Sequence, residues 1–175
     1  MKLSAGKKIL AFAVVFLFVG LVALYVLEFH WLGNTFGAGR LLLYAFALGF
    51  LVSFGLSRRL TRKVESDYDK MRLSLLIIFI GTLFTPLFAS LSNRLLSPYP
   101  VENRPFLFLE ERPVSDLKII DEKNAPRGWF IFIMKDGKIE RVKSSQRLFK
   151  DVEKGANVVL PVKKGLWGFE FAALP

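Results

Sequence analysis

The side chains that most often carry out chemistry are scarce in this sequence. The chain has no cysteine and a single histidine, His30. Thiolate nucleophiles, disulfides and cysteine-rich metal sites are therefore excluded. One histidine without cysteine partners does not make a zinc site, and beside Trp31 a surface histidine is the simpler interpretation. We expect no catalytic residue, no metal and no cofactor.

Two other patterns resemble sites but lack what the chemistry requires. The glycines between residues 33 and 39 follow no predicted strand and precede no Lys-Ser or Lys-Thr pair, so they do not form a phosphate loop. The paired acids Glu110 and Glu111 stand next to Arg112 in a turn-like context, which indicates a solvated surface and not acid-base catalysis. We therefore expect that the protein is not an enzyme.

An apolar run near the N-terminus organises the chain. Residues 9–27 contain no charge and follow the basic residues Lys7 and Lys8. A helix of this length reaches roughly across a hydrocarbon core of about 30 Å. A cleaved signal peptide is the alternative, but its apolar region is about 7 to 15 residues long and ends in small residues, whereas this run ends in Tyr25-Val26-Leu27. We interpret it as an uncleaved membrane anchor.

Two further apolar stretches, at about 41–60 and 73–96, predict second and third membrane helices. Pro86 predicts a kink in the third, because proline cannot donate to the carbonyl of Thr82. The apolar runs within the three predicted spans, 9–27, 41–56 and 73–91, contain no Asp, Glu, Lys, Arg or His. This argues against a proton relay or a transporter of charged substrates.

A stripe of small residues on the second predicted helix indicates close helix packing. Ala45, Gly49 and Ser53 recur every four residues, so they share one helix face. Small residues let membrane helices approach closely. The stripe leaves open whether the neighbouring helix belongs to this chain, to a second copy or to another protein.

The distribution of basic residues predicts the orientation. The formal net charge is +10, and much of it flanks the apolar stretches: Lys2, Lys7 and Lys8 precede the first, and 57–72 separates the second from the third. Basic loops stay in the cytoplasm. We therefore predict a multi-pass protein of a bacterial-type inner membrane, with a cytoplasmic N-terminus and a periplasmic or extracellular C-terminal domain. We expect no nucleic-acid polymer as a partner.

The remaining sequence changes in character after a proline-rich linker at 97–105. We predict a transmembrane unit at 1–96 and a small β-rich domain at 106–175, which together make three transmembrane helices followed by a small antiparallel β-barrel or rolled sheet of SH3-like or OB-like size. The strongest strand is 128–134, and Asp136-Gly137 predicts a hairpin after it.

Weaker patterns predict the other elements of this domain. The further strands are expected at 106–109, 117–120, 139–143, 158–162 and 166–172. Residues 144–154 are expected to form one or two helical turns that point Leu148, Phe149 and Val152 inward. Pro161 is expected to mark an edge strand or a bulge. In the last strand Trp167, Phe169 and Phe171 are expected to share one face.

Two functional hypotheses fit these features. The first is an accessory or scaffold subunit that docks through its helices, with membrane lipids and other membrane subunits or itself as partners. The second is a sensor-effector whose β-domain binds a small anionic ligand such as a nucleotide. The residues that we expect at a partner or ligand surface are aromatic or basic: Trp129, Lys138, Arg141, Lys143, Lys163, Lys164 and Trp167.

Overall fold

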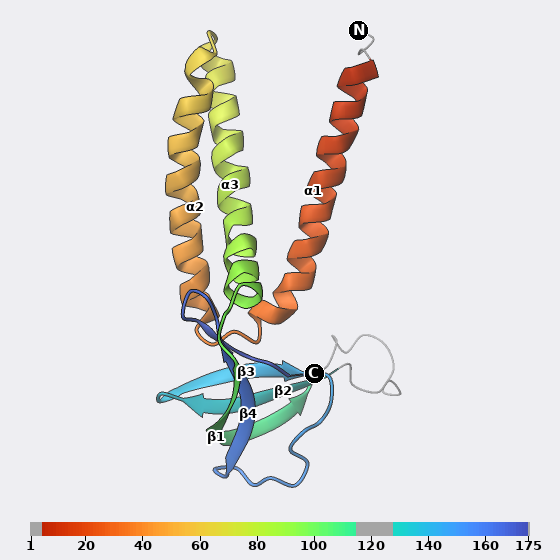
Figure 1. Cartoon of the computed structure of the whole chain (residues 1–175), viewed down its shortest axis with the longest axis vertical. Coiled ribbons are helices and arrows are strands. Elements are labelled where there is room, and N and C mark those ends of the chain that lie inside the picture. Colours follow the sequence, from red (N-terminus) through yellow and green to blue (C-terminus); the bar gives the residue numbers. More distant parts are fainter. Residues whose placement is uncertain (1–4, 115–127, 175) are drawn as a thin grey trace. The chain divides into compact units, whose positions relative to one another are not determined.

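Figure 1 shows the fold as a computed structural model, which describes residues 5–114 and 128–174. The chain divides into two compact units. The first, here called the helical unit, contains Met1–Phe29 and Leu42–Ser90. The second, called the β-unit, contains His30–Leu41 and Leu91–Pro175. The structure thus groups the connector between the first two helices with the β-unit, whereas the sequence pattern placed it with the membrane helices.

Three long helices confirm the predicted membrane-spanning segments. They are α1 (Ala5–Leu32), α2 (Ala38–Leu60) and α3 (Asp67–Leu95). Each is long and apolar enough to cross a membrane, so the chain is a multi-pass membrane protein. A short 3₁₀ turn, η1 (Thr61–Lys63), follows α2. The Ser66 hydroxyl accepts a hydrogen bond from the Asp69 amide at 3.3 Å, which caps the start of α3.

The first helix is longer than its apolar run. It continues past Leu27 and includes Glu28, so the expectation that no ionisable residue lies within a span is wrong for α1. A helix does not end at the first polar residue, because glutamate is itself a good helix former. Glu28 is also buried within the helical unit, 4% exposed.

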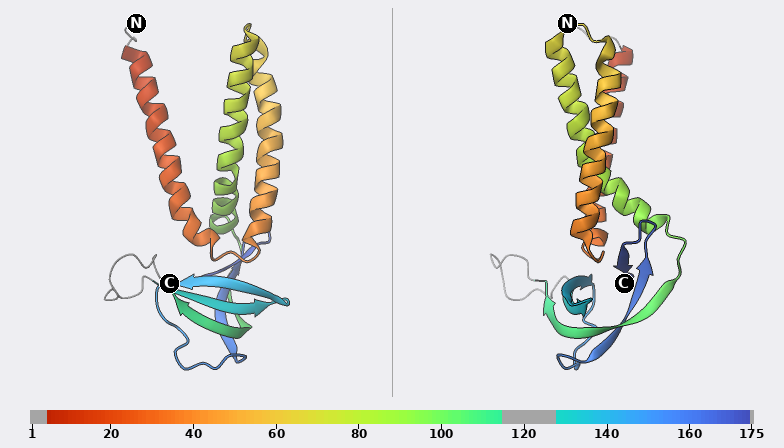
Figure 2. Two further views of the ribbon diagram at one scale, coloured as in Figure 1. Left: turned by 180° about the vertical axis from the view of Figure 1, so that it is seen from behind. Right: turned by 90° about the vertical axis from the view of Figure 1, so that its left-hand side faces the viewer.

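The third helix contains Pro86 without a break in its helical assignment. Proline removes one backbone donor and crowds the preceding turn. The helix bends in its second half, as the right-hand view in Figure 2 shows. The hydroxyl of Thr85 donates to the carbonyl of Gly81 at 2.6 Å, one turn before the proline.

The β-unit is built on one five-stranded antiparallel sheet in the order β3-β2-β1-β4-β5. Its strands are β1 (Val101–Pro113), β2 (Trp129–Lys135), β3 (Lys138–Ser144), β4 (Asn157–Lys164) and β5 (Glu170–Ala172). The sheet curls into a nearly closed, barrel-like form (Figures 1 and 2). This confirms the predicted fold class of membrane helices followed by a small all-β domain. β1 starts at Val101, inside the segment expected to be linker.

The apolar residues that alternate along these strands form the core. Ile131, Ile133 and Val142 are fully buried on one face of β2 and β3. The two strands are joined at Asp136 and Gly137, which both have positive φ, 50° and 73°. This is the geometry of the two-residue turn that Asp-Gly favours, so the hairpin prediction is confirmed. The strand expected at 117–120 lies outside the described residues.

Three expectations for the β-unit are wrong. Residues 145–154 contain no helix, because the buried Glu111 carboxylate accepts hydrogen bonds from the amides of Leu148 and Phe149 at 2.9 and 3.1 Å and holds them in a loop. Phe149 and Val152 still pack against the core, whereas Leu148 is exposed.

Pro161 lies in an interior strand and not at an edge or a bulge, since β4 pairs with both β1 and β5. It is tolerated because β5 is short: the ladder to β5 begins at Val162, and the Pro161 carbonyl accepts from the Ala173 amide at 2.9 Å. The nitrogen that lacks a hydrogen therefore faces the end of a strand and interrupts no ladder.

The last strand is also shorter than predicted. Only Glu170–Ala172 pairs with β4, and the chain between the two strands turns at Gly168, which has φ +83°. Phe171 is buried, but Trp167 is 59% exposed. The aromatic alternation therefore does not describe one strand face.

Candidate functional site

The connector between α1 and α2 completes the β-unit. Asn34 is 1% exposed. Its side chain forms hydrogen bonds with β3 of the kind that the backbone of a neighbouring strand would form. Its amide group donates to the Lys143 carbonyl at 3.0 Å and accepts from the Lys143 amide at 2.6 Å. Its own carbonyl accepts from the Ala172 amide at 2.9 Å. Asn34 thus joins the two edge strands of the sheet, β3 and β5.

The next two residues extend this closure. Thr35 forms a β-bridge with Phe171. The Phe36 amide donates to the Glu170 carbonyl at 2.8 Å, and the Phe36 ring, 5% exposed, belongs to the core, 5.7 Å from the Phe106 ring. The edges of a small sheet are therefore covered by chain from the membrane connector, which protects them from pairing with other molecules.

A charged cluster stands beside this closure. The Glu170 carboxylate binds Lys135 at 2.5 Å and Arg104 at 2.6 Å, and Arg104 also binds Glu102 at 2.7 Å. The Lys135 ammonium lies 4.4 Å from the Phe36 ring centre. All five residues belong to the β-unit, and they connect β1, β2 and β5 with the connector.

The cluster shifts the pKa of its members. Burial by itself raises the pKa of Glu170, but the hydrogen bonds and charges of Lys135 and Arg104 together outweigh it, so this pKa is lowered from its ordinary value. The pKa of Arg104 is raised, chiefly by its hydrogen bond to Glu102 and by the charge of Glu170. Both shifts favour the charged forms of Glu170 and Arg104.

A second asparagine holds the turn between β4 and β5. Asn93, near the end of α3, is 1% exposed. Its side chain donates to the Phe169 carbonyl at 3.0 Å and accepts from the Trp167 amide at 3.0 Å, while its backbone carbonyl accepts from the Leu166 amide at 2.9 Å. A side chain on Gly165 would collide with Asn93. The turn is therefore fixed to the last turns of α3.

The sheet face opposite the core carries aromatic rings covered by guanidinium groups. Phe130 and Phe132 of β2 are half-buried there. Arg141 lies 4.6 Å from the Phe130 ring centre, and Arg112 lies 5.9 Å from that of Phe132. Ile139 on the same face is 66% exposed. We call these five residues the outer sheet face.

The structure separates the residues expected at a partner or ligand surface into two groups. Arg141 and Lys143 share the outer side of β3, with Lys138 at the start of that strand, and Trp129 is on β2. Lys163, Lys164 and Trp167 belong to β4 and the turn after it, and β1 lies between β2 and β4 in the sheet.

The small-residue stripe of α2 faces α3. A side chain on Gly49 would collide with Thr85, and one on Gly81 would collide with Ser53. Ala45 is 4% exposed. These contacts place the two helix backbones close together along the stripe. Pro86 is fully buried in the same unit.

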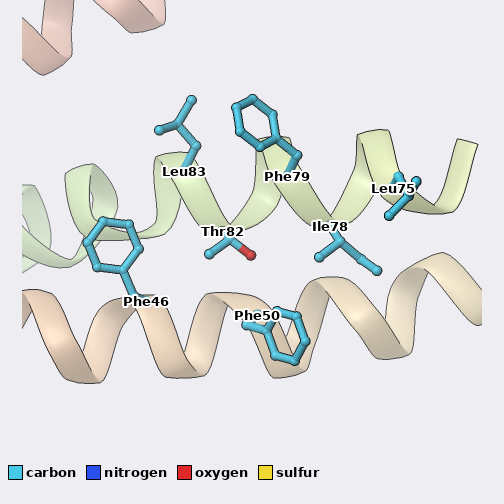
Figure 3. Close-up of a pocket in the computed structure, with 7 residues that line it drawn as sticks. All are labelled: Phe46, Phe50, Leu75, Ile78, Phe79, Thr82 and Leu83. Atoms are coloured by element: carbon cyan, nitrogen blue, oxygen red, sulfur yellow. The ribbon is translucent and has the colours of Figure 1, made fainter. Parts of the chain in front are cut away.

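A cavity of about 350 Å³ lies between the same two helices (Figure 3). Its lining is almost wholly apolar, from two residues of α2 and five of α3: Phe46, Phe50, Leu75, Ile78, Phe79, Thr82 and Leu83. The Thr82 hydroxyl oxygen is buried and has no hydrogen-bond partner.

Sequence reasoning missed three polar residues that the structure buries: Asn34, Asn93 and Glu28. The Ser90 hydroxyl donates to the Glu28 carboxylate at 2.9 Å, which ties α1 to α3. Glu28 directly follows the apolar run 9–27, and Asn34 lies in the connector after it. Polar residues in such places usually mark a loop, so their spacing does not indicate burial. Within the described ranges, no three acidic or histidine side chains are grouped so as to hold a metal ion.

Comparison with protein-family models, with curated proteins and with solved structures finds no match for this chain.

Proposed function

We propose that this protein is a non-enzymatic accessory or scaffold subunit of a larger membrane complex. Its helices dock to the membrane part of the complex, and its β-unit, on the extracytoplasmic side, contacts a partner protein. The outer sheet face is the observation that carries this proposal.

The composition of this face fits a protein interface. Aromatic and arginine side chains are the types most enriched where interfaces concentrate their binding energy. Stacking on Phe130 and Phe132 restricts the two arginines, so a partner has less side-chain freedom to remove when it binds. Ile139 adds an exposed apolar group beside them.

The helical unit supports the same proposal. The stripe of α2 is used by α3, so docking to other subunits falls to the remaining helix surfaces. Helix α1 is the least buried of the three candidate spans, and its first half is apolar and exposed, with Phe12 77% and Phe16 82% exposed. The sensor hypothesis gains less support, because the lysines that it requires lie in two groups separated by β1.

The test is purification of the full-length protein from its native membrane in mild detergent, with the Arg141→Glu variant in parallel. We expect a discrete set of co-purifying proteins with the unaltered chain and at least a tenfold loss with the variant, because the substitution reverses one charge at the face. Lys150→Glu is the matched control. Lys150 is exposed in the loop after β3, and the same charge change there should leave co-purification intact.

Equal co-purification with Arg141→Glu and Lys150→Glu would remove the outer sheet face from the proposal. A lone, monodisperse monomer in every mild detergent would contradict the accessory role itself.

A further inference from the structure

The turn between β4 and β5 exposes two large apolar side chains although it is firmly held. Leu166 is 42% exposed and Trp167 is 59% exposed. The backbone amides of both residues are bound by Asn93, and the Trp167 indole donates to the Ser92 hydroxyl at 2.8 Å. Three hydrogen bonds therefore hold this turn in a conformation that exposes the two apolar side chains at the surface.

The anchor of this turn is a membrane helix close to its end. Ser92 and Asn93 lie in the last turn of α3, which ends at Leu95. The end of a membrane-spanning helix lies near the boundary between hydrocarbon and headgroups. Leu166 and Trp167 are hydrogen-bonded to the residues of this last turn.

The neighbouring residues have the composition of a membrane interface. Leu95 and Leu96 are each 64% exposed. The Arg94 guanidinium lies 4.6 Å from the Trp31 ring centre, and the Lys164 ammonium lies 5.1 Å from that of Tyr99. Tryptophan and tyrosine concentrate at the headgroup level of membranes, and basic side chains reach from there to the phosphates.

We propose that the β4–β5 turn, residues 165–168, inserts Leu166 and Trp167 into the headgroup layer of the membrane at the point where α3 leaves it. The β-unit is then a lipid-binding module as well as a partner surface. This inference depends on α3 crossing the membrane and does not depend on the partner proposed above.

The experiment uses the absence of cysteine from the chain. A single cysteine at Leu166→Cys carries an environment-sensitive fluorophore, and the full-length protein is reconstituted in vesicles of phosphatidylcholine and phosphatidylglycerol. Lipids that bear a quencher near the headgroup are compared with lipids that bear it deep in the acyl chain. Two references are labelled in the same way: Leu51→Cys, exposed on the membrane helix α2, and Leu148→Cys, exposed on a loop of the β-unit.

We expect the label at Leu166 to be quenched at least twofold more by the shallow quencher than by the deep one, with emission shifted to the blue of the Leu148 label. The proposal is overturned if the Leu166 label is as little quenched as the Leu148 label while the Leu51 label is quenched. Since Leu166 is exposed and makes its anchoring bond through its backbone, the substitution should leave the fold intact.

Discussion

At the scale of single residues, the side chains of two buried asparagines form backbone hydrogen bonds of the kind that a neighbouring strand usually provides. Asn34 supplies an amide that pairs with the backbone of Lys143, and Asn93 supplies one that holds the turn from Leu166 to Phe169. An asparagine side chain carries one acceptor and two donor hydrogens, so it can replace one peptide group of a ladder. Both side chains fix chain segments that are distant in sequence.

The first prediction concerns Asn34→Ala. The substitution leaves two backbone groups of Lys143 without a partner in a buried region, and we expect the unfolding free energy of the β-unit to fall by about 1–3 kcal/mol. The matched control is Asn103→Ala, an exposed asparagine of β1, which should cost less than about 0.5 kcal/mol. Chemical denaturation of both variants, monitored by tryptophan fluorescence, measures the difference. Equal losses would show that Asn34 does not close the sheet.

The second prediction concerns the pH dependence that Glu170 introduces. Its pKa is lower in the folded protein than in the unfolded chain, so its stabilising effect is complete above the unfolded value of about 4.3 and is lost as the pH falls through the folded value. The stability advantage of the unaltered protein over Glu170→Gln should thus be constant near neutral pH and shrink below about pH 4. Thermal unfolding in detergent across this range tests it. A difference that does not vary with pH would contradict a charged role for Glu170.

At the scale of elements, some helices and turns of this chain can be predicted from neighbouring residues, and other features cannot. Long apolar runs and the Asp136-Gly137 turn depend on neighbouring residues only, and the structure confirms both. The closure of the sheet by residues 34–36 depends on chain more than a hundred residues away, and no local period encodes it. The apolar spacing at 144–154 fits a helix, but the structure has a loop at 145–154. The Glu111 carboxylate, which lies on β1, accepts hydrogen bonds from the amides of Leu148 and Phe149, and no local pattern in the sequence encodes this contact.

The third prediction concerns the packing of α2 on α3. Gly49→Ala places a methyl group against Thr85, and we expect a loss of about 1–3 kcal/mol in stability from the overpacked contact. Gly55→Ala is the matched control on the same helix, because a side chain there would meet no atom within 4 Å. We expect Gly55→Ala to leave the stability unchanged. Thermal unfolding of both variants in lipid nanodiscs gives the comparison, and an unchanged midpoint for Gly49→Ala would exclude close packing at this position.

At the scale of the whole molecule, the boundary between the two units falls inside all three helices. The last residues of α1 and α3 and the first residues of α2 belong to the β-unit. The β-unit is built partly from the chain that leaves the membrane helices.

The central claim is that all three helices cross the membrane, so that the β-unit lies on the extracytoplasmic side. Paired fusions of alkaline phosphatase and green fluorescent protein after Pro175, and again after Val64 between α2 and α3, test it directly, because the two reporters are active in opposite compartments. The account predicts an active phosphatase and a dark fluorescent protein after Pro175, with the reverse after Val64. A fluorescent fusion without phosphatase activity after Pro175 would contradict it.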